Sequence, residues 1–256
     1  MRKNPKYELL IIFFMETGLF ATVFYQPIYN ALVFLIAAAP GANVGIAIIL
    51  LTILVRVVLL PLAHKSVVSQ AKMREIAPHV EKLKEKHKDD KQEQARKTME
   101  LYREYGINPF SGCFLVLLQL PIIFALYFVF FKGLPNLNAD HLYSFVHLPE
   151  AVNMMFLGIL LSKKSIILAL LAAVTQYYQI KLSIPSLAPL AKDAKPSFKD
   201  DFARSFNMQM RYMLPLIVFG ISYSISAAIA LYWTVSNLFS IGHELYVKRK
   251  AKEIIK

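Results

Sequence analysis

The residue with the clearest chemical potential in this sequence is an arginine inside an apolar segment. Arg56 is the single charge in the segment 43–63, which is long enough to cross a membrane as a helix. An arginine at this depth costs about 2.5–3.5 kcal/mol even on the most lenient insertion scale. Its side chain therefore either extends to the membrane surface or faces a water-filled cavity open to the cytoplasm. We favour the cavity, because every Asp and Glu lies outside the apolar stretches of the five core spans (43–63, 108–131, 165–183 and 212–242).

Four other residues in the apolar segments could line the same cavity as Arg56. They are two amides from separate segments, Gln119 and Gln176, and two residues near the end of the chain, Trp233 and Asn237. Taken singly, each polar side chain is explained by a hydrogen bond between helices worth about 0.6 kcal/mol. Taken together, we expect the five residues to form a polar groove that binds a substrate.

The sequence contains no motif for covalent catalysis or for a cofactor. It has no Gly-rich phosphate loop, no His-Glu-x-x-His, no clustered carboxylates and no Gly-x-Ser-x-Gly. The single cysteine, Cys113, excludes an internal disulfide and a zinc site built on cysteines. We therefore predict that the protein is not an enzyme and holds no metal or cofactor.

Composition places these residues in a membrane protein. Of 256 residues, 56% are hydrophobic and only 18% are charged, whereas soluble domains carry about 25% charge. The formal net charge of +12 suits an anionic surface such as lipid head groups or ribosomal RNA. A water-soluble enzyme is excluded on this basis.

The distribution of apolar residues predicts an all-α integral membrane protein. We expect a five-helix transmembrane core, a cytoplasmic helical hairpin and an N-terminal interfacial or short transmembrane segment. The predicted units are an N-terminal segment (1–42), a first span (43–63), the hairpin (64–107), a second span (108–131), an extracytoplasmic loop (132–164), a third span (165–183), a cytoplasmic loop (184–206), the fourth and fifth spans (207–246) and a basic tail (247–256).

The N-terminal segment allows two interpretations. Residues 9–25 are mostly apolar but contain Glu16, and their length is at the short limit for crossing a bilayer. Arg2, Lys3 and Lys6 precede them, as in a signal-like sequence. The alternative is an amphipathic helix that lies in the membrane interface.

Basic residues predict the orientation in the plasma (inner) membrane. The hairpin, the second loop and the tail together carry 22 Lys and Arg, whereas the opposite side carries 3. By the positive-inside rule, the hairpin and the C-terminus are cytoplasmic in a multi-pass protein. The hairpin itself has 11 basic and 8 acidic residues, which favours docking to proteins and anionic lipid head groups over DNA or other nucleic acid.

Five ordered stretches resemble the membrane protein insertases of the YidC/Oxa/Alb superfamily, specifically the bacterial YidC group. The resemblance covers residues 25–250, nearly the whole chain. The stretches are YQPIYNAL (25–32), IAIILLTILVRVVLLPL (46–62), KMREIAP (72–78), LQLPIIFALY (118–127) and LYWTVSNLFSI (231–241). Two features depart from the family's pattern: ISAA at 225–228 stands where a Phe-Pro-x-Gly-like turn is usual, and Ser111 replaces a common glycine.

The resemblance implies an insertase and chaperone for nascent membrane proteins. Arg56 would be the groove arginine, with Gln119, Gln176 and Trp233 at groove-lining positions. The short hydrophilic tail of a substrate would pass through the groove, and its hydrophobic segment would be released into lipid. The ribosome and the Sec translocon would be further partners. Two alternatives are a transporter of small anionic solutes and a structural membrane chaperone without insertion activity.

Overall fold

The computed structural model describes residues 18–88, 90–108, 111–130, 137–183 and 198–254. Predictions for residues 1–17, 132–136, 184–197 and 255–256 lie outside this part of the chain. The elements in order are η1 (Ala21–Tyr25), α2 (Gln26–Ala38), η2 (Pro40–Ala42), α3 (Val44–Val58), α4 (Leu60–Glu75), α5 (Ala77–Lys86), α6 (Lys91–Glu104), α7 (Ser111–Phe128), η4 (Ala139–His141), β1 (Met155–Phe156), β2 (Ile159–Leu160), α8 (Ile166–Ser183), α9 (Phe198–Ile225) and α10 (Ala227–Ile254).

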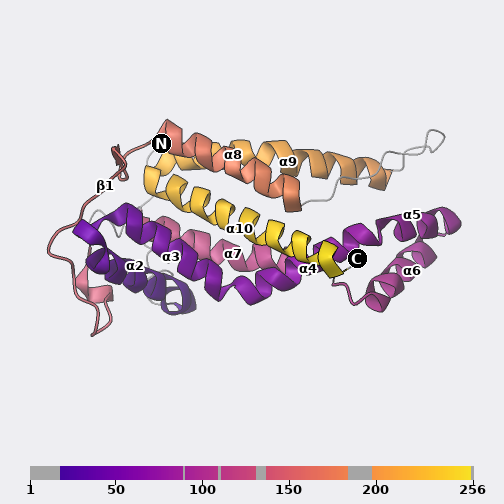
Figure 1. The fold of residues 1–256 in the computed structure, drawn as a ribbon, viewed down its shortest axis with the longest axis horizontal. Coiled ribbons are helices and arrows are strands. Elements are labelled where there is room, and N and C mark those ends of the chain that lie inside the picture. The colour runs from indigo at the N-terminus through magenta and orange to yellow at the C-terminus, as the bar shows by residue number, and fades with distance from the viewer. Residues whose placement is uncertain (1–17, 89, 109–110, 131–136, 184–197, 255–256) are drawn as a thin grey trace.

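The helices form an elongated bundle with α10 at its centre (Figure 1). Helix α10 packs on α8 and on α3, and α8 packs on α9. Helices α2, α3 and α7 lie on the opposite side of α10 from α8 and α9. At one end, here called the hairpin end, α5 and α6 project from the bundle; the other end, the loop end, carries η4 and the two strands. The predicted all-α membrane fold is confirmed.

Two helical stretches in the described part of the chain are long and apolar enough to cross a membrane, 21–38 and 166–183. Helices α3 and α4 pass the same test together, although they are bent by 64° at their junction, and this raises the number to three. Helices α7, α9 and α10 run along the same bundle (Figure 1).

Prolines divide the helical segments that precede α6. Helix α3 ends at Val58 and α4 restarts at Leu60 with Pro61 in its first turn. A proline there has no N–H to give to the preceding turn, so the backbone bends instead of continuing straight. In the same way Pro78 lies in the first turn of α5, after a break at Ile76. The hairpin segment that precedes its turn is therefore two helices, α4 and α5.

Local signals fix the second helix of the hairpin. The Asp90 carboxylate accepts the backbone N–H groups of residues 92 and 93 and caps the start of α6. Gly106, with a φ of 63°, ends it. Ile76, Val80 and Ile107 are buried together and join α5 to the end of α6. The hairpin thus has a small apolar core of its own.

The last two helices differ from the expected ranges at two boundaries. Helix α10 continues to Ile254, into the range 247–256 that the sequence predicts as a basic tail. Helix α9 begins at Phe198 and so occupies part of the range 184–206 that the sequence predicts as a loop. Its break from α10 is the single residue Ser226, inside the range predicted to hold the fourth and fifth spans.

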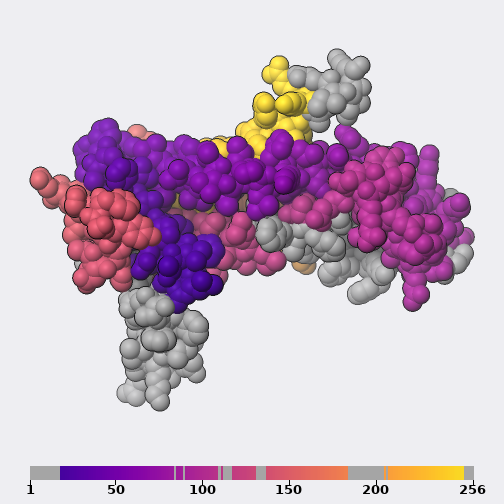
Figure 2. Space-filling model, turned by 90° about the horizontal axis from the view of Figure 1, so that it is seen from below, coloured from indigo at the N-terminus to yellow at the C-terminus, as the bar shows by residue number. Residues whose placement is uncertain are grey.

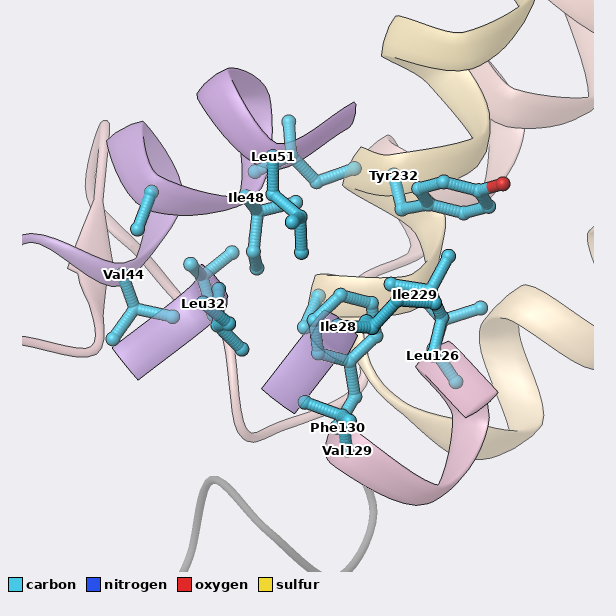
Figure 3. Packing of buried hydrophobic residues seen from close by; sticks show 14 of the residues in the cluster. Ile28, Leu32, Val44, Ile48, Leu51, Leu126, Val129, Phe130, Ile229 and Tyr232 are labelled. Atoms are coloured by element: carbon cyan, nitrogen blue, oxygen red, sulfur yellow. The ribbon is translucent and has the colours of Figure 1, made fainter. Parts of the chain in front are cut away.

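The main core lies towards the loop end, where α2, α3, α7 and α10 converge (Figure 3). Its side chains are aliphatic or aromatic and have almost no exposed surface. They include Ile28, Leu32, Val44, Ile48, Leu51, Leu126, Val129, Phe130, Ile229 and Tyr232. This core fixes α3 against α10, and these two helices carry the candidate site.

Candidate functional site

Arg56 lies in the last turn of α3 and reaches across to α10. Its Nε donates to Ser236 Oγ at 2.9 Å, and its Nη2 donates to the same oxygen. The guanidinium is partly buried and has five N–H donors in all. Among the residues that the structure describes, no carboxylate pairs with it and Ser236 is its hydrogen-bond partner. Three N–H groups are therefore left for water or for a substrate.

A tyrosine one turn before Ser236 extends the site to a third helix. Tyr232 is buried on α10 and lies close to Arg56. Its hydroxyl accepts a hydrogen bond of 2.9 Å from Gln119 Nε2 on α7. Arg56, Gln119, Tyr232 and Ser236 are called the arginine cluster below. Since its donors and acceptors are neutral apart from the guanidinium, the cluster carries a net positive charge.

Gln176 and Asn237 make their hydrogen bonds elsewhere, at the interface of α8 and α10. Asn237 Nδ2 donates to Thr175 Oγ1 at 3.2 Å and to Ala172 O at 3.3 Å. Gln176 Nε2 donates to Gln179 Oε1, 3.2 Å away on its own helix. Both side chains are buried. Asn237 thus joins α10 to α8, whereas Gln176 bonds within α8. Neither contributes a hydrogen bond to the arginine cluster.

Trp233 borders an apolar cavity of about 270 Å³ between α7, α9 and α10. Tyr232 of the arginine cluster also lines this cavity, so the cluster and the apolar cavity meet at its side chain. The other lining residues are all apolar or aromatic: Ile123, Phe124, Leu126, Tyr127, Phe128, Phe130, Ile221, Ile225 and Ile229.

Metal-ligating side chains approach each other at one point near the hairpin end. His64 Nδ1 of α4 and His243 Nε2 of α10 are 3.3 Å apart and share a hydrogen bond. Within the described ranges, no group of three or more His, Cys, Asp or Glu is placed to hold a metal ion.

Two members of the arginine cluster, Tyr232 and Ser236, are not among the predicted site residues. They are four residues apart and so lie on one face of α10. The predicted pair, Trp233 and Asn237, has the same spacing and lies on the neighbouring face. The sequence signal for Tyr232 and Ser236 is a hydroxyl at both positions, since two hydroxyls on one helix face can accept from Arg56 and Gln119.

Comparison with known proteins agrees with this architecture. Residues 35–254 match the family described as 60Kd inner membrane protein, and the chain belongs to that family, which is the YidC/Oxa insertase family. It is thus an integral protein of the plasma membrane.

Among its relatives, the "Membrane protein insertase YidC" of Clostridium tetani is 34% identical and is matched over 82% of this chain and 84% of its own length. That of Fusobacterium nucleatum is 33% identical, with 81% and 87% covered. That of Clostridium perfringens is 33% identical, with 93% of both chains covered.

Proposed function

We propose that this protein is a membrane protein insertase in which the arginine cluster receives the hydrophilic tail of a nascent membrane protein. The observation that carries the proposal is a guanidinium between α3 and α10 whose hydrogen-bond partner, among the described residues, is a neutral hydroxyl. Family membership supports the same activity, because the relatives are named as insertases. The process needs no covalent chemistry, since it moves a chain and makes or breaks no covalent bond.

The cluster lowers the cost of holding polar groups at membrane depth. An unpaired polar group in hydrocarbon costs several kcal/mol. The free N–H groups of Arg56 can bind backbone carbonyls and carboxylates of the tail, and Gln119 and Tyr232 add a neutral donor and acceptor. A hydrogen bond to a charged group is worth about 1.5–3 kcal/mol. Tails with Asp or Glu therefore gain most from Arg56.

The apolar segment of the substrate leaves through the neighbouring cavity. This cavity lies between α7, α9 and α10, and its lining is apolar or aromatic. It adjoins the cluster at Tyr232, which lines the cavity and bonds to Gln119. A chain that is polar at one end and apolar at the other can thus contact both environments at once, after which transfer of the apolar part into lipid is favourable.

We place the hairpin and the C-terminus in the cytoplasm, where the substrate arrives. Exposed residues of both signs line α6, with Arg96 paired to Glu93 and Glu100. Such a mixed surface suits transient docking of protein partners and of anionic lipid head groups. The ribosome and the Sec translocon are the protein partners that we propose for it.

The test is insertion into proteoliposomes of substrates that differ only in whether their tail is acidic or neutral. Arg56→Ala is expected to slow insertion of the acidic-tailed substrate by about tenfold to a hundredfold, equivalent to about 1.5–3 kcal/mol. Arg56→Lys retains part of the activity, because the charge remains but the forked geometry is lost. Arg56→Glu should be the most impaired variant with the acidic tail.

The matched control is Arg103→Ala, which removes the same charge from an exposed position on α6. Because Arg103 lies outside the cluster, any change it causes should be the same for the acidic-tailed and the neutral-tailed substrate. If Arg56→Ala and Arg103→Ala handle the two tails equally well, the electrostatic role of the cluster is wrong. Solute flux through the vesicles without any insertion would instead indicate a transporter.

A further inference from the structure

The turn between β1 and β2 at the loop end combines backbone strain with exposed apolar surface. Leu157 and Gly158 form the two-residue turn of the β1–β2 hairpin. Both have a positive φ, of 48° and 78°. Gly, Asn and Asp favour such turns, whereas a leucine there is sterically disfavoured. Leu157 is nevertheless 86% exposed, so contacts with the described part of the chain cover little of it and offset little of the strain.

The other face of this hairpin is fixed to the bundle. The Phe156 side chain covers Gly45 at the start of α3 so closely that a Cβ on Gly45 would lie 2.3 Å from the ring. Two backbone hydrogen bonds add to this contact: Val44 N donates to Asn153 O at 3.0 Å, and Ala227 N donates to the carbonyl of residue 163 at 2.8 Å. The hairpin is therefore held at the level where α3 and α10 begin, and Figure 1 places it at that end of the bundle.

Neighbouring residues have the order expected at a membrane surface. Met155, which precedes Phe156 in β1, is 48% exposed. Lys163 and Lys164 are exposed, and the exposed apolar residues Ile166 and Ile167 follow them at the start of α8. A pair of lysines just before a lipid-facing apolar helix surface is typical of the head-group level, where their ammonium groups meet phosphates.

We propose that the β1–β2 hairpin is a membrane anchor, in which Met155 and Leu157 insert into the lipid leaflet at the loop end and Lys163 and Lys164 bind its phosphates. The partner is the bilayer because the exposed apolar tip is followed along the chain by two exposed lysines and then by the exposed apolar start of α8. Transfer of the leucine side chain into lipid offsets the unfavourable turn conformation. The anchor does not depend on insertase activity and is tested without it.

The experiment places an environment-sensitive fluorophore at the tip. In a Cys113→Ser background, Leu157→Cys and Asp140→Cys are labelled with NBD and reconstituted in phosphatidylcholine vesicles with and without phosphatidylglycerol. Asp140 is the control, because it is an exposed polar residue of the same loop. The label at position 157 is expected to emit at shorter wavelength than the label at 140. Lipids that carry a nitroxide near the head group should quench it more than lipids with a nitroxide near the chain end.

A second variant separates the anchor from the folding of the turn. Leu157→Asn suits a positive φ and should keep the hairpin intact. A label on Met155→Cys is expected to lose its blue shift and its quenching when Leu157→Asn is added. Equal spectra at positions 157 and 140, or protection of the tip by an added protein but not by lipid, would overturn the proposal.

Discussion

A buried carboxylate ties the hairpin end of the bundle together and gives the sharpest prediction of stability. The Glu244 side chain on α10 is 3% exposed. It accepts from Ser183 Oγ at 2.6 Å, and it lies 3.4 Å from Arg74 of α4 and 3.1 Å from Lys248. Both cations also donate to the carbonyl of Leu182 at the end of α8. Three helices are thus joined through one acid.

The expected loss in the free energy of unfolding follows from the difference in exposure between the buried acid and its two cationic partners. Arg74 and Lys248 are 25% and 28% exposed, so Arg74→Ala or Lys248→Ala alone should cost about 1 kcal/mol while the other cation remains. Removing both leaves the carboxylate buried with Ser183 as its hydrogen-bond partner, which should cost about 3–5 kcal/mol. The double variant is therefore expected to lose more than the sum of the single losses.

The assay is unfolding of the purified protein in mixed micelles, followed by far-UV circular dichroism. Adding Glu244→Gln to the double variant should recover part of the loss, because the uncompensated charge is removed. The reasoning is refuted if the two single losses simply add, or if Glu244→Gln makes no difference in the double variant.

Two further predictions concern the start of α3 and the hairpin. Gly45→Ala should destabilise the protein by about 1–3 kcal/mol, because the new Cβ would overlap the Phe156 side chain. The control in the same unfolding assay is Gly242→Ala, whose Cβ meets open space and which should be neutral or stabilising. In α6, the hydrogen bond from Arg96 lowers the pKa of Glu93. The stability that this hydrogen bond gives to the folded protein is therefore fully present above the ordinary glutamate pKa, and it is lost as pH falls through the lowered value. Arg96→Gln should raise that pKa in an NMR titration, and an unchanged value would contradict the assignment.

The sequence by itself was sufficient for the class of fold, and it singles out Arg56 as the central residue of the candidate site. Length and apolar composition require membrane-spanning helices, because only a helix or a closed barrel satisfies its backbone inside lipid. An arginine in such a segment with no acid in any span predicted a polar site, and the structure gives Arg56 a neutral partner. The break before Pro78 and the end of α6 at Gly106 coincide with residues that interrupt helices, whereas the bend at Pro61 lies inside the segment 43–63 that the sequence predicts as one span.

The partners of that arginine were decided by the tertiary structure. Along α10 the pairs 232/236 and 233/237 have the same spacing, and both contain polar groups. Which pair faces α3 depends on the rotation of the helix about its axis. That rotation is set by how α8 and α3 pack on α10 together, through contacts such as Asn237 with Thr175 and Arg56 with Ser236. Periodicity within one helix cannot supply this information, since it fixes which residues share a face but not which neighbour that face meets.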